Sequence, residues 1–216
     1  MRRIMKSKHG ASIGLALIAT VLLGACANQN GEALPPSTSL GSQTASPDEY
    51  KYLIGPGDSV QIFVWRNPEV SQAVTVRPDG KISTPLVEDL QASGKTPTQL
   101  ARDLEKALET YIRQPIVTVI VAGGIGPYSE QIRVVGQATS PQAIAYKRNM
   151  TLMDVMIVVG GLTNFADGNN TKIVRIVDGQ QKEYLVRVDD LLNDGDISAN
   201  VDMLPGDILI IPESWF

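Results

Sequence analysis

Short apolar runs separated by turns of Gly, Pro and Asp recur along the chain and predict a series of strands. Residues 59–65 alternate only in part, so we expect a strand that is buried on much of both faces. Residues 75–77 and 81–84 flank a Pro-Asp-Gly turn and predict a hairpin. Residues 116–122 form a nearly continuous β-branched run, which is typical of a buried strand.

A helical repeat of apolar residues precedes this last run. Thr96 can cap the helix, Pro97 suits its first turn, and Gln99 completes a capping box. Apolar positions continue at helical spacing as far as Ile112, and Pro115 is expected to end the helix.

The second half of the chain predicts strands around one further helix. Thr151 and Asp154 can form a capping box at its start, and Gly160-Gly161 is a helix stop. Asp178-Gly179 is typical of a two-residue hairpin turn. The expected strands lie at residues 131–136, 142–146, 172–177, 183–188 and 204–212, with a helical turn at 188–192. This order predicts a small mixed sheet curled over one helix, as in β-grasp domains, and a ferredoxin-like arrangement is the alternative.

These patterns predict an α+β fold with two small mixed domains, at residues 48–122 and 130–213. The second domain is expected to be β-grasp-like. Residues 123–129, GGIGPYS, are interpreted as a hinge. Residues 26–47 are rich in Ser, Thr, Pro and Gly, so we expect a flexible tether ahead of the folded body.

The chain begins with a leader at residues 1–25. It has a basic start, and its apolar stretch at residues 13–23 is too short to span a bilayer comfortably. It ends in Leu-Gly-Ala-Cys, the bacterial lipoprotein pattern, so Cys26 is expected to be acylated and to anchor the chain. The alternative is an ordinary secretion signal followed by a chance Cys. Ala27 is compatible with sorting to the outer membrane.

Composition limits the chemistry. The leader holds four of the 19 basic residues and none of the 23 acidic ones, which leaves 15 basic residues and a formal charge of −8 after cleavage. This balance argues against nucleic acid as a partner. His9 is the only His and lies in the leader, and Cys26 is the only Cys. Ser-His-Asp and Cys-His catalysis, the usual zinc sites and internal disulfides are therefore excluded, and no cofactor or metal is expected.

Acidic residues cluster at residues 189–196, DDLLNDGD. A calcium-binding loop needs ligands at regular alternate positions and a closing Glu. The cluster lacks that register, which favours a solvated loop.

The first half resembles the export domain of the bacterial polysaccharide export family, lipoproteins that help to move capsule or exopolysaccharide out of the cell. The matching segments are YLIGPGD (52–58), VQIFVW (60–65), VRPDGKISTPLV (76–87) and QPIVTVIV (114–121). The second half resembles the soluble ligand-binding β-grasp (SLBB) domain of the same family. Its matching segments are IRVVGQATSPQAI (132–144), TLMDVMIVVGGLT (151–163) and VDMLPGDILIIP (201–212).

The resemblance implies a non-enzymatic lipoprotein subunit of an exopolysaccharide or capsule export machine. It would form a periplasmic ring or adaptor at the outer membrane. The implied partners are the polysaccharide, further copies of the chain and an inner-membrane polysaccharide copolymerase. The best-known members add more β-grasp repeats and a C-terminal pore helix, which needs roughly 20 residues. The sequence ends at Phe216, just after the closing strand, so we expect a short member whose pore comes from a separate outer-membrane β-barrel.

Candidate contact residues follow from the chemistry of their side chains and their places in the sequence. Trp65, Arg77, Asp79 and Lys81 are candidates for contact with polysaccharide or with a neighbouring subunit. The alternatives are core packing for Trp65 and a solvated turn for the three charged residues.

Trp215 and Phe216 are candidates for contact with a partner or the membrane interface. Their alternative is packing back on the last strand. The Pro-Gly-Asp turns at residues 56–58 and 205–207 are interpreted chiefly as turn geometry.

Two other functions remain open at this stage. One is a monomeric periplasmic sugar-binding lipoprotein, which oligomeric state would separate from an export ring. The other is a carboxylate-based glycan hydrolase or lyase, although no paired-carboxylate motif stands out.

Overall fold

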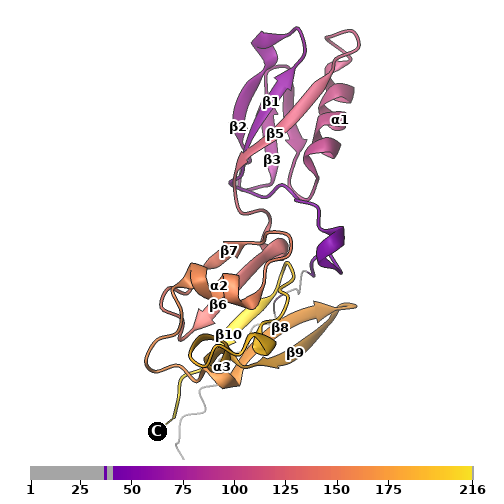
Figure 1. The fold of residues 1–216 in the computed structure, drawn as a ribbon. Helices are drawn as coiled ribbons and strands as arrows, with labels where there is room; N and C mark the ends of the chain where they lie inside the picture. The colour runs from indigo at the N-terminus through magenta and orange to yellow at the C-terminus, as the bar shows by residue number, and fades with distance from the viewer. Residues whose placement is uncertain (1–36, 38–40, 216) are drawn as a thin grey trace, which may run out of the picture. The chain divides into compact units, whose positions relative to one another are not determined.

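The computed structural model describes residue 37 and residues 41–215 (Figure 1). The leader, the lipidation expected at Cys26, and Phe216 lie outside the described residues. Within the described ranges, no helix combines the length and the apolar character needed to cross a membrane.

The first lobe, residues 52–123, contains a three-stranded antiparallel sheet in the order β2-β1-β5. A separate two-stranded ladder joins β3 to β4, and one helix, α1, packs on the same core. Two single-turn 3₁₀ helices, η1 (Pro47–Glu49) and η2 (Pro68–Val70), precede or interrupt these elements. The strands and the helix are β1 (Ser59–Val64), β2 (Gln72–Thr75), β3 (Lys81–Thr84), β4 (Val87–Gln91), α1 (Pro97–Leu108) and β5 (Val117–Gly123).

The prediction of a hairpin across Pro78-Asp79-Gly80 is wrong, because the two strands that flank the turn do not pair with each other. The turn itself forms, because the Arg77 N–H donates to the Lys81 carbonyl at 2.9 Å and the Gly80 N–H donates to the Arg77 carbonyl at 2.8 Å. The flanking strands do not continue this ladder, since β2 pairs with β1 and β3 pairs with β4. The local turn signal was correct, whereas the choice of strand partner depends on the rest of the lobe.

The expectation of burial on both faces is also wrong for β1 and β5. Both strands alternate between buried and exposed residues. The buried positions of both strands contribute to one core with Leu100 and Leu104 of α1 and Ile82 of β3. The other face of the sheet leaves Phe63 and Ile120 exposed. Apolar character on this outer face therefore does not reflect core packing.

Helix α1 begins as predicted, because Thr96 and Gln99 form both bonds of a capping box. It ends earlier than expected, at Leu108 rather than near Pro115. Tyr111 lies beyond the helix and is exposed, so it is not part of the apolar face.

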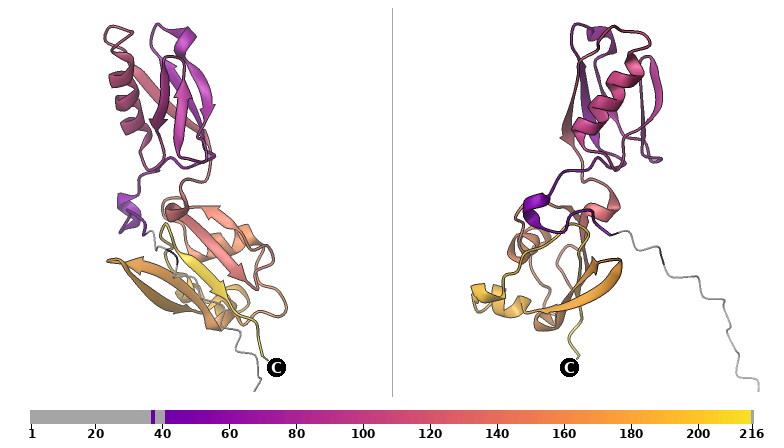
Figure 2. Two further views of the ribbon diagram at one scale, coloured as in Figure 1. Left: turned by 180° about the vertical axis from the view of Figure 1, so that it is seen from behind. Right: turned by 90° about the vertical axis from the view of Figure 1, so that its right-hand side faces the viewer.

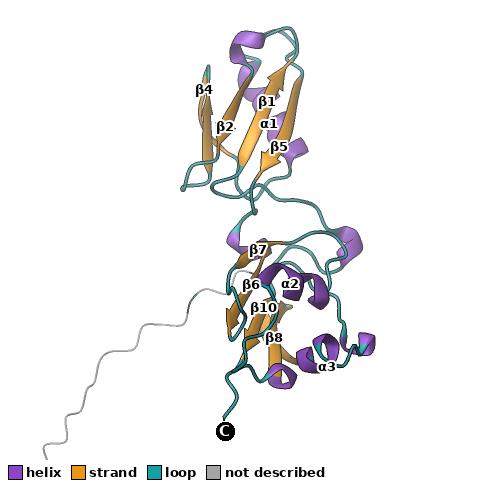
Figure 3. Cartoon of the chain, turned by 60° about the vertical axis from the view of Figure 1, so that its left-hand side comes forward, coloured by secondary structure: helices purple, strands orange, loops and turns teal. Residues whose placement is uncertain are grey.

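The second lobe, residues 130–213, contains a five-stranded mixed sheet in the order β7-β6-β10-β8-β9. The central pair, β6 and β10, is parallel, and the other pairs are antiparallel. Strand β9 forms an outer edge (Figure 2). Helices α2 and α3 lie on the same side of the sheet (Figure 3). The 3₁₀ turn η3 (Tyr128–Glu130) leads into the lobe, and the further elements are β6 (Gln131–Gly136), β7 (Ala143–Ala145), α2 (Leu152–Val159), η4 (Gly168–Asn170), β8 (Thr171–Val177), β9 (Gln180–Val186), α3 (Val188–Leu192), η5 (Ile197–Ala199) and β10 (Ile208–Ile211).

Local signals in this lobe are confirmed. Thr151 and Asp154 form a capping box on α2, and Gly160 ends it in the left-handed conformation at φ 78°. Asp178 and Gly179 have φ of 53° and 73°, as a tight hairpin turn between β8 and β9 requires. The α+β fold class is confirmed, with one principal helix packed on a mixed sheet.

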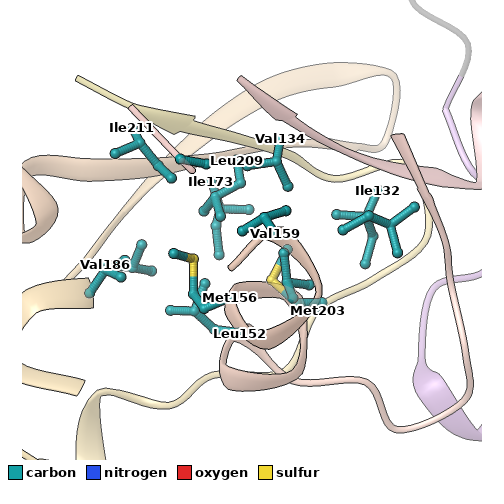
Figure 4. Close-up of a cluster of buried hydrophobic side chains, with 14 of the residues drawn as sticks. Ile132, Val134, Leu152, Met156, Val159, Ile173, Val186, Met203, Leu209 and Ile211 are labelled. Carbon is teal, nitrogen blue, oxygen red and sulfur yellow. The ribbon is translucent and has the colours of Figure 1, made fainter. Parts of the chain in front are cut away.

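The core of the second lobe lies between α2 and the sheet (Figure 4). Leu152, Met156 and Val159 of α2 point toward Ile173 of β8 and Leu209 of β10. Burying one side chain of this size stabilises the folded state by about 1.5–3 kcal/mol relative to leaving it exposed. This packing accounts for the one-sided burial of α2.

Candidate functional site

The two Pro-Gly-Asp turns are built in the same way. Asp58 and Asp207 are both fully buried. In each turn the aspartate Oδ2 accepts a hydrogen bond at 2.8 Å from the backbone N–H three residues earlier, that of Gly55 or Leu204. The aspartate N–H also donates at 3.2 Å to the carbonyl of that same earlier residue. This geometry supports the interpretation of the aspartates as turn-forming residues.

Asp58 has further partners that sequence reasoning missed. Its Oδ1 accepts hydrogen bonds from the N–H groups of Ile125 at 3.1 Å and Gly126 at 3.2 Å. Its Oδ2 also accepts the Tyr52 hydroxyl at 2.5 Å. Several donors can satisfy a buried carboxylate without a cation, so these bonds stabilise it in the protein interior. The segment interpreted as a hinge is therefore hydrogen-bonded to the first lobe at residues 125 and 126.

Close backbone packing reinforces the same junction. A Cβ added at Gly55 would lie 2.1 Å from the carbonyl carbon of Gly126. A Cβ added at Gly124, where φ is +147°, would lie 1.9 Å from the Asp58 Oδ1. Both positions require glycine because neighbouring atoms lie too close for a Cβ, and not because the loop must be flexible.

Asp207 uses a different partner from Asp58. Arg175 of β8 donates from Nε to Oδ1 and from Nη2 to Oδ2, both at 2.7 Å. This bidentate pair raises the pKa of Arg175, chiefly through the hydrogen bond to Asp207. The second Pro-Gly-Asp turn, which precedes β10, is thereby tied to the neighbouring strand β8 of its own lobe.

The segment just before the first lobe contacts the second lobe. The buried Glu130 accepts hydrogen bonds from the Ser42 hydroxyl at 2.8 Å and from the Gln43 N–H at 3.1 Å. Farther along, the Tyr50 ring meets the Tyr146 ring edge-on, with centroids 4.8 Å apart. The end of the segment expected to be a flexible tether therefore makes specific bonds at residues 42 and 43.

The side-chain pKa values of two tyrosines at these contacts are raised. Burial, with a smaller contribution from the charge of Glu130, raises the pKa of Tyr50 to about 12. Burial also raises the pKa of Tyr52, and the hydrogen bond to Asp58 adds to the shift. Both environments stabilise the neutral phenol relative to the phenolate.

We expect these two phenols to ionise late when the folded protein is titrated with base. A pKa raised in the folded state stabilises the fold below the unfolded value near 10, and this contribution is lost as the pH rises through about 12. The phenolate absorbance should therefore show a late component that Tyr50→Phe reduces. In denaturant the tyrosines should ionise together near pH 10. A Tyr50→Phe variant that keeps the full late component would contradict the assignment.

The four candidate contact residues of the first lobe do not come together. Trp65 follows the end of β1, whereas Arg77 follows Thr75, which pairs with Ser59 at the start of β1. The two candidate regions therefore lie at opposite ends of the sheet. Trp65 is 53% exposed, so core packing is excluded for it.

The charged turn is internally paired. Arg77 donates to Asp89 and, at 2.6 Å, to Asp79, while the Lys81 N–H donates to the Asp79 carboxylate at 3.2 Å. The hydrogen bond to Asp89 and the charge of Asp79 raise the pKa of Arg77. Two carboxylates thus neutralise the guanidinium, and contact of this turn with polysaccharide stays a prediction.

At the other end of the chain, Trp215 is 97% exposed and does not pack back on β10. A contact role for it stays a prediction. Near α3, Asp190 and Asp196 both pair with Arg187. In the part of the chain that the structure describes, no group of three or more His, Cys, Asp or Glu is placed to hold a metal ion.

Comparison with known proteins gives matches in both halves of the chain. Residues 46–122 match the family described as polysaccharide biosynthesis/export protein, and residues 130–211 match the SLBB domain. The EPS I polysaccharide export outer membrane protein EpsA of Ralstonia solanacearum is 24% identical over 205 residues, covering 84% of this chain and 53% of that protein. EpsA of Ralstonia nicotianae is 25% identical over 186 residues, covering 75% of this chain and 47% of that protein.

A third relative belongs to another genus. The exopolysaccharide production protein ExoF of Rhizobium meliloti is 27% identical over 139 residues, covering 59% of this chain and 32% of that protein. The chain thus spans about half, or less, of the length of the relatives that it matches.

Proposed function

Because the chain belongs to the polysaccharide biosynthesis/export protein family, we propose that it is a non-enzymatic, lipid-anchored subunit of an export machine at the outer membrane. Its role is to guide an extracellular polysaccharide across the cell envelope. The observation that carries the proposal is the succession of the two matched domains, at residues 46–122 and 130–211. The names of the EpsA relatives, polysaccharide export outer membrane proteins, support both the cargo and the location.

We further propose that the chain acts as a closed ring or as an adaptor. An inner-membrane polysaccharide copolymerase and a separate outer-membrane barrel are its proposed neighbours. A ring of identical subunits needs two different, complementary surfaces on each copy, because its contacts run head to tail.

The second lobe offers two such surfaces. On α2, Ile157 is 70% exposed and Val158 is also exposed, on the side of the helix that faces away from the sheet. Across the sheet, Val135 and Ile210 are exposed on paired strands, and Leu185 of β9, which is 64% exposed, lies on the same face beyond Lys172 of β8. Since α2 packs on one face of the sheet, these two apolar surfaces lie on opposite sides of the lobe. This arrangement supports a second copy of the chain as the occupant of each surface.

Assembly can be tested by a charge placed on α2. We expect Ile157→Glu to convert the oligomer to smaller species, because a carboxylate in an apolar contact must be desolvated without a partner. The absolute mass of the detergent-solubilised protein, measured by light scattering with the detergent subtracted, reports the change. Ile197→Glu, another exposed isoleucine on the 3₁₀ turn η5, is the matched control and should leave the mass unchanged.

The same measurement tests the ring itself. A wild-type chain that stays monomeric at high concentration would refute self-assembly, leaving a partner-dependent adaptor or a monomeric sugar-binding lipoprotein. The export function is tested separately, by deleting the gene in the source bacterium and measuring extracellular polysaccharide. Normal secretion without the protein would refute the proposed function, and depolymerisation of the polysaccharide by purified protein would refute its non-enzymatic character.

A further inference from the structure

The turn that follows β1 presents aromatic and basic side chains to solvent. Trp65 is more than half exposed, and Phe63 on the same face of the strand lies with its ring centroid 6.4 Å away at an angle of 65°. Arg66 comes next, and its guanidinium carbon lies 6.0 Å from the centre of the Trp65 ring. Large exposed aromatic groups beside a cation are uncommon on a surface that only faces water, and they are typical of binding sites.

The backbone of this turn is held in an unusual conformation. Arg66 has φ of 61°, in the left-handed region that non-glycine residues rarely adopt. The Asn67 N–H donates to the Val64 carbonyl at 3.1 Å, and its side-chain amide donates to the Trp65 carbonyl at 2.9 Å. The Ser71 hydroxyl accepts the Val64 N–H at 2.9 Å and is 3.0 Å from the Asn67 carbonyl. These bonds preorganise the positions of Trp65 and Arg66 before any ligand binds.

Within residues 41–215, the positive charge of Arg66 has no ion-pair partner. Among the described residues, no carboxylate oxygen lies within 4.0 Å of its guanidinium. Arg77, Arg175 and Arg187, in contrast, each form an ion pair with an aspartate. A free guanidinium beside an exposed indole is thus available to a ligand, in a chain whose net charge is −4.

An apolar surface adjoins the turn. The Ile116 carbonyl accepts the Trp65 N–H at 2.9 Å, so the start of β5 lies directly beside the turn. Ile116 and Ile120 are both exposed, and Thr118 pairs with Phe63 across the two strands. The outer face of the sheet therefore continues from Trp65 along β5, which provides room for a polymer longer than one sugar unit.

We propose that the turn formed by Trp65 and Arg66 binds an acidic sugar unit, such as a uronic acid, within the exported polysaccharide. The indole stacks on the C–H face of the sugar ring, while the Arg66 guanidinium pairs with its carboxylate. This inference rests on the proposed export function and names the class of polymer. The net negative charge of the protein as a whole would favour a neutral or cationic glycan. The local positive charge of Arg66 leads to the opposite expectation.

The test is a binding titration with the lipidated full chain in detergent. Trp215→Phe is used as the background so that tryptophan fluorescence reports Trp65 alone, and oligogalacturonate is compared with a neutral maltooligosaccharide of equal length. We expect the acidic oligosaccharide to bind at least about tenfold more tightly, with an affinity that falls as salt rises.

By calorimetry, Trp65→Ala and Arg66→Gln should each weaken its binding by about tenfold. Arg187→Gln, which removes a guanidinium already paired with two carboxylates, should leave binding unchanged.

Three results would overturn the proposal. One is equal binding of the acidic and neutral oligosaccharides, and another is acidic binding that survives both substitutions. The third is a Trp65→Ala variant with a changed oligomeric mass and unchanged glycan affinity, which would make the turn a subunit contact.

The secretion assay distinguishes a failure of the binding inference from a failure of the export function. If the gene is required for secretion but the acidic oligosaccharide does not bind at Trp65, the binding inference fails and the export function stands. If secretion does not need the gene, the export function fails whatever the titration shows.

Discussion

Replacing Asp58 by alanine is expected to destabilise the first lobe by about 3 kcal/mol or more. The substitution leaves the N–H groups of Gly55, Ile125 and Gly126 and the Tyr52 hydroxyl without their acceptor at a fully buried position. Each buried donor that loses its partner costs about 1–3 kcal/mol, less whatever water can restore. The loss falls on the junction between the first lobe and residues 125–126 as well as on the turn.

The asparagine variant separates shape from hydrogen bonding. Asp58→Asn keeps the volume of the side chain but turns one acceptor into a donor, which then faces other donors. We therefore expect a large part of the alanine effect to persist in Asp58→Asn. Retention of wild-type stability in this variant would show that packing, and not the carboxylate, holds the junction.

Thermal unfolding followed by circular dichroism measures the effect. A loss of 3 kcal/mol in a lobe of this size corresponds to a fall in Tm of at least about 12 °C. Asp79→Ala is the control, because it removes an exposed aspartate whose ion pair with Arg77 is worth at most about 1 kcal/mol. Equal shifts for the two variants would contradict the central role of Asp58.

Replacing Gly136 by alanine is expected to disrupt the second lobe, with a loss of about 4 kcal/mol or more. Gly136 has φ of 90° and ends β6 opposite Ile211 of β10. A Cβ at this position would lie 1.9 Å from the Ile211 carbonyl oxygen, which also accepts the Gln137 N–H at 3.0 Å. Because the obstacle is backbone in the central parallel pair, the two strands would have to separate.

Gly179→Ala is the matched control for this substitution. It also has positive φ, at 73°, but no atom of the described part of the chain lies within 4 Å of the added Cβ. It should cost only the conformational strain of about 1–2 kcal/mol. Thermal unfolding of both variants isolates the steric part as the difference between them. Similar losses would mean that β6 and β10 can adjust, and that the approach of Gly136 to Ile211 is not essential.

Local features were the ones that sequence reasoning predicted well. The capping boxes at Thr96 and Thr151 and the Asp178-Gly179 turn involve neighbours a few residues apart, so their chemistry is complete within the segment. The polysaccharide export family was also predicted correctly, since its motifs are contiguous stretches of the chain.

Errors arose where the outcome depended on distant partners. The turn at Pro78-Asp79-Gly80 forms, but β2 and β3 each find another strand, and no local pattern shows which edges are free. The incomplete alternation in β1 and the nearly continuous apolar run in β5 were taken for burial on both faces, because a sequence cannot show that α1 covers only one of them.

The sequence by itself determined the secondary-structure boundaries that caps and turns mark, the α+β class and the family. The tertiary structure decided what the polar residues do. It brought Asp58 to backbone groups 67 and 68 positions farther along the chain, and it gave Asp207 the guanidinium of Arg175, 32 positions before it. It also left Arg66 beside an exposed Trp65 with no carboxylate partner among the described residues. Pairing and burial arise from contacts between distant segments, so only the folded chain distinguishes two aspartates in identical Pro-Gly-Asp turns, or a neutralised arginine from one that is free to bind.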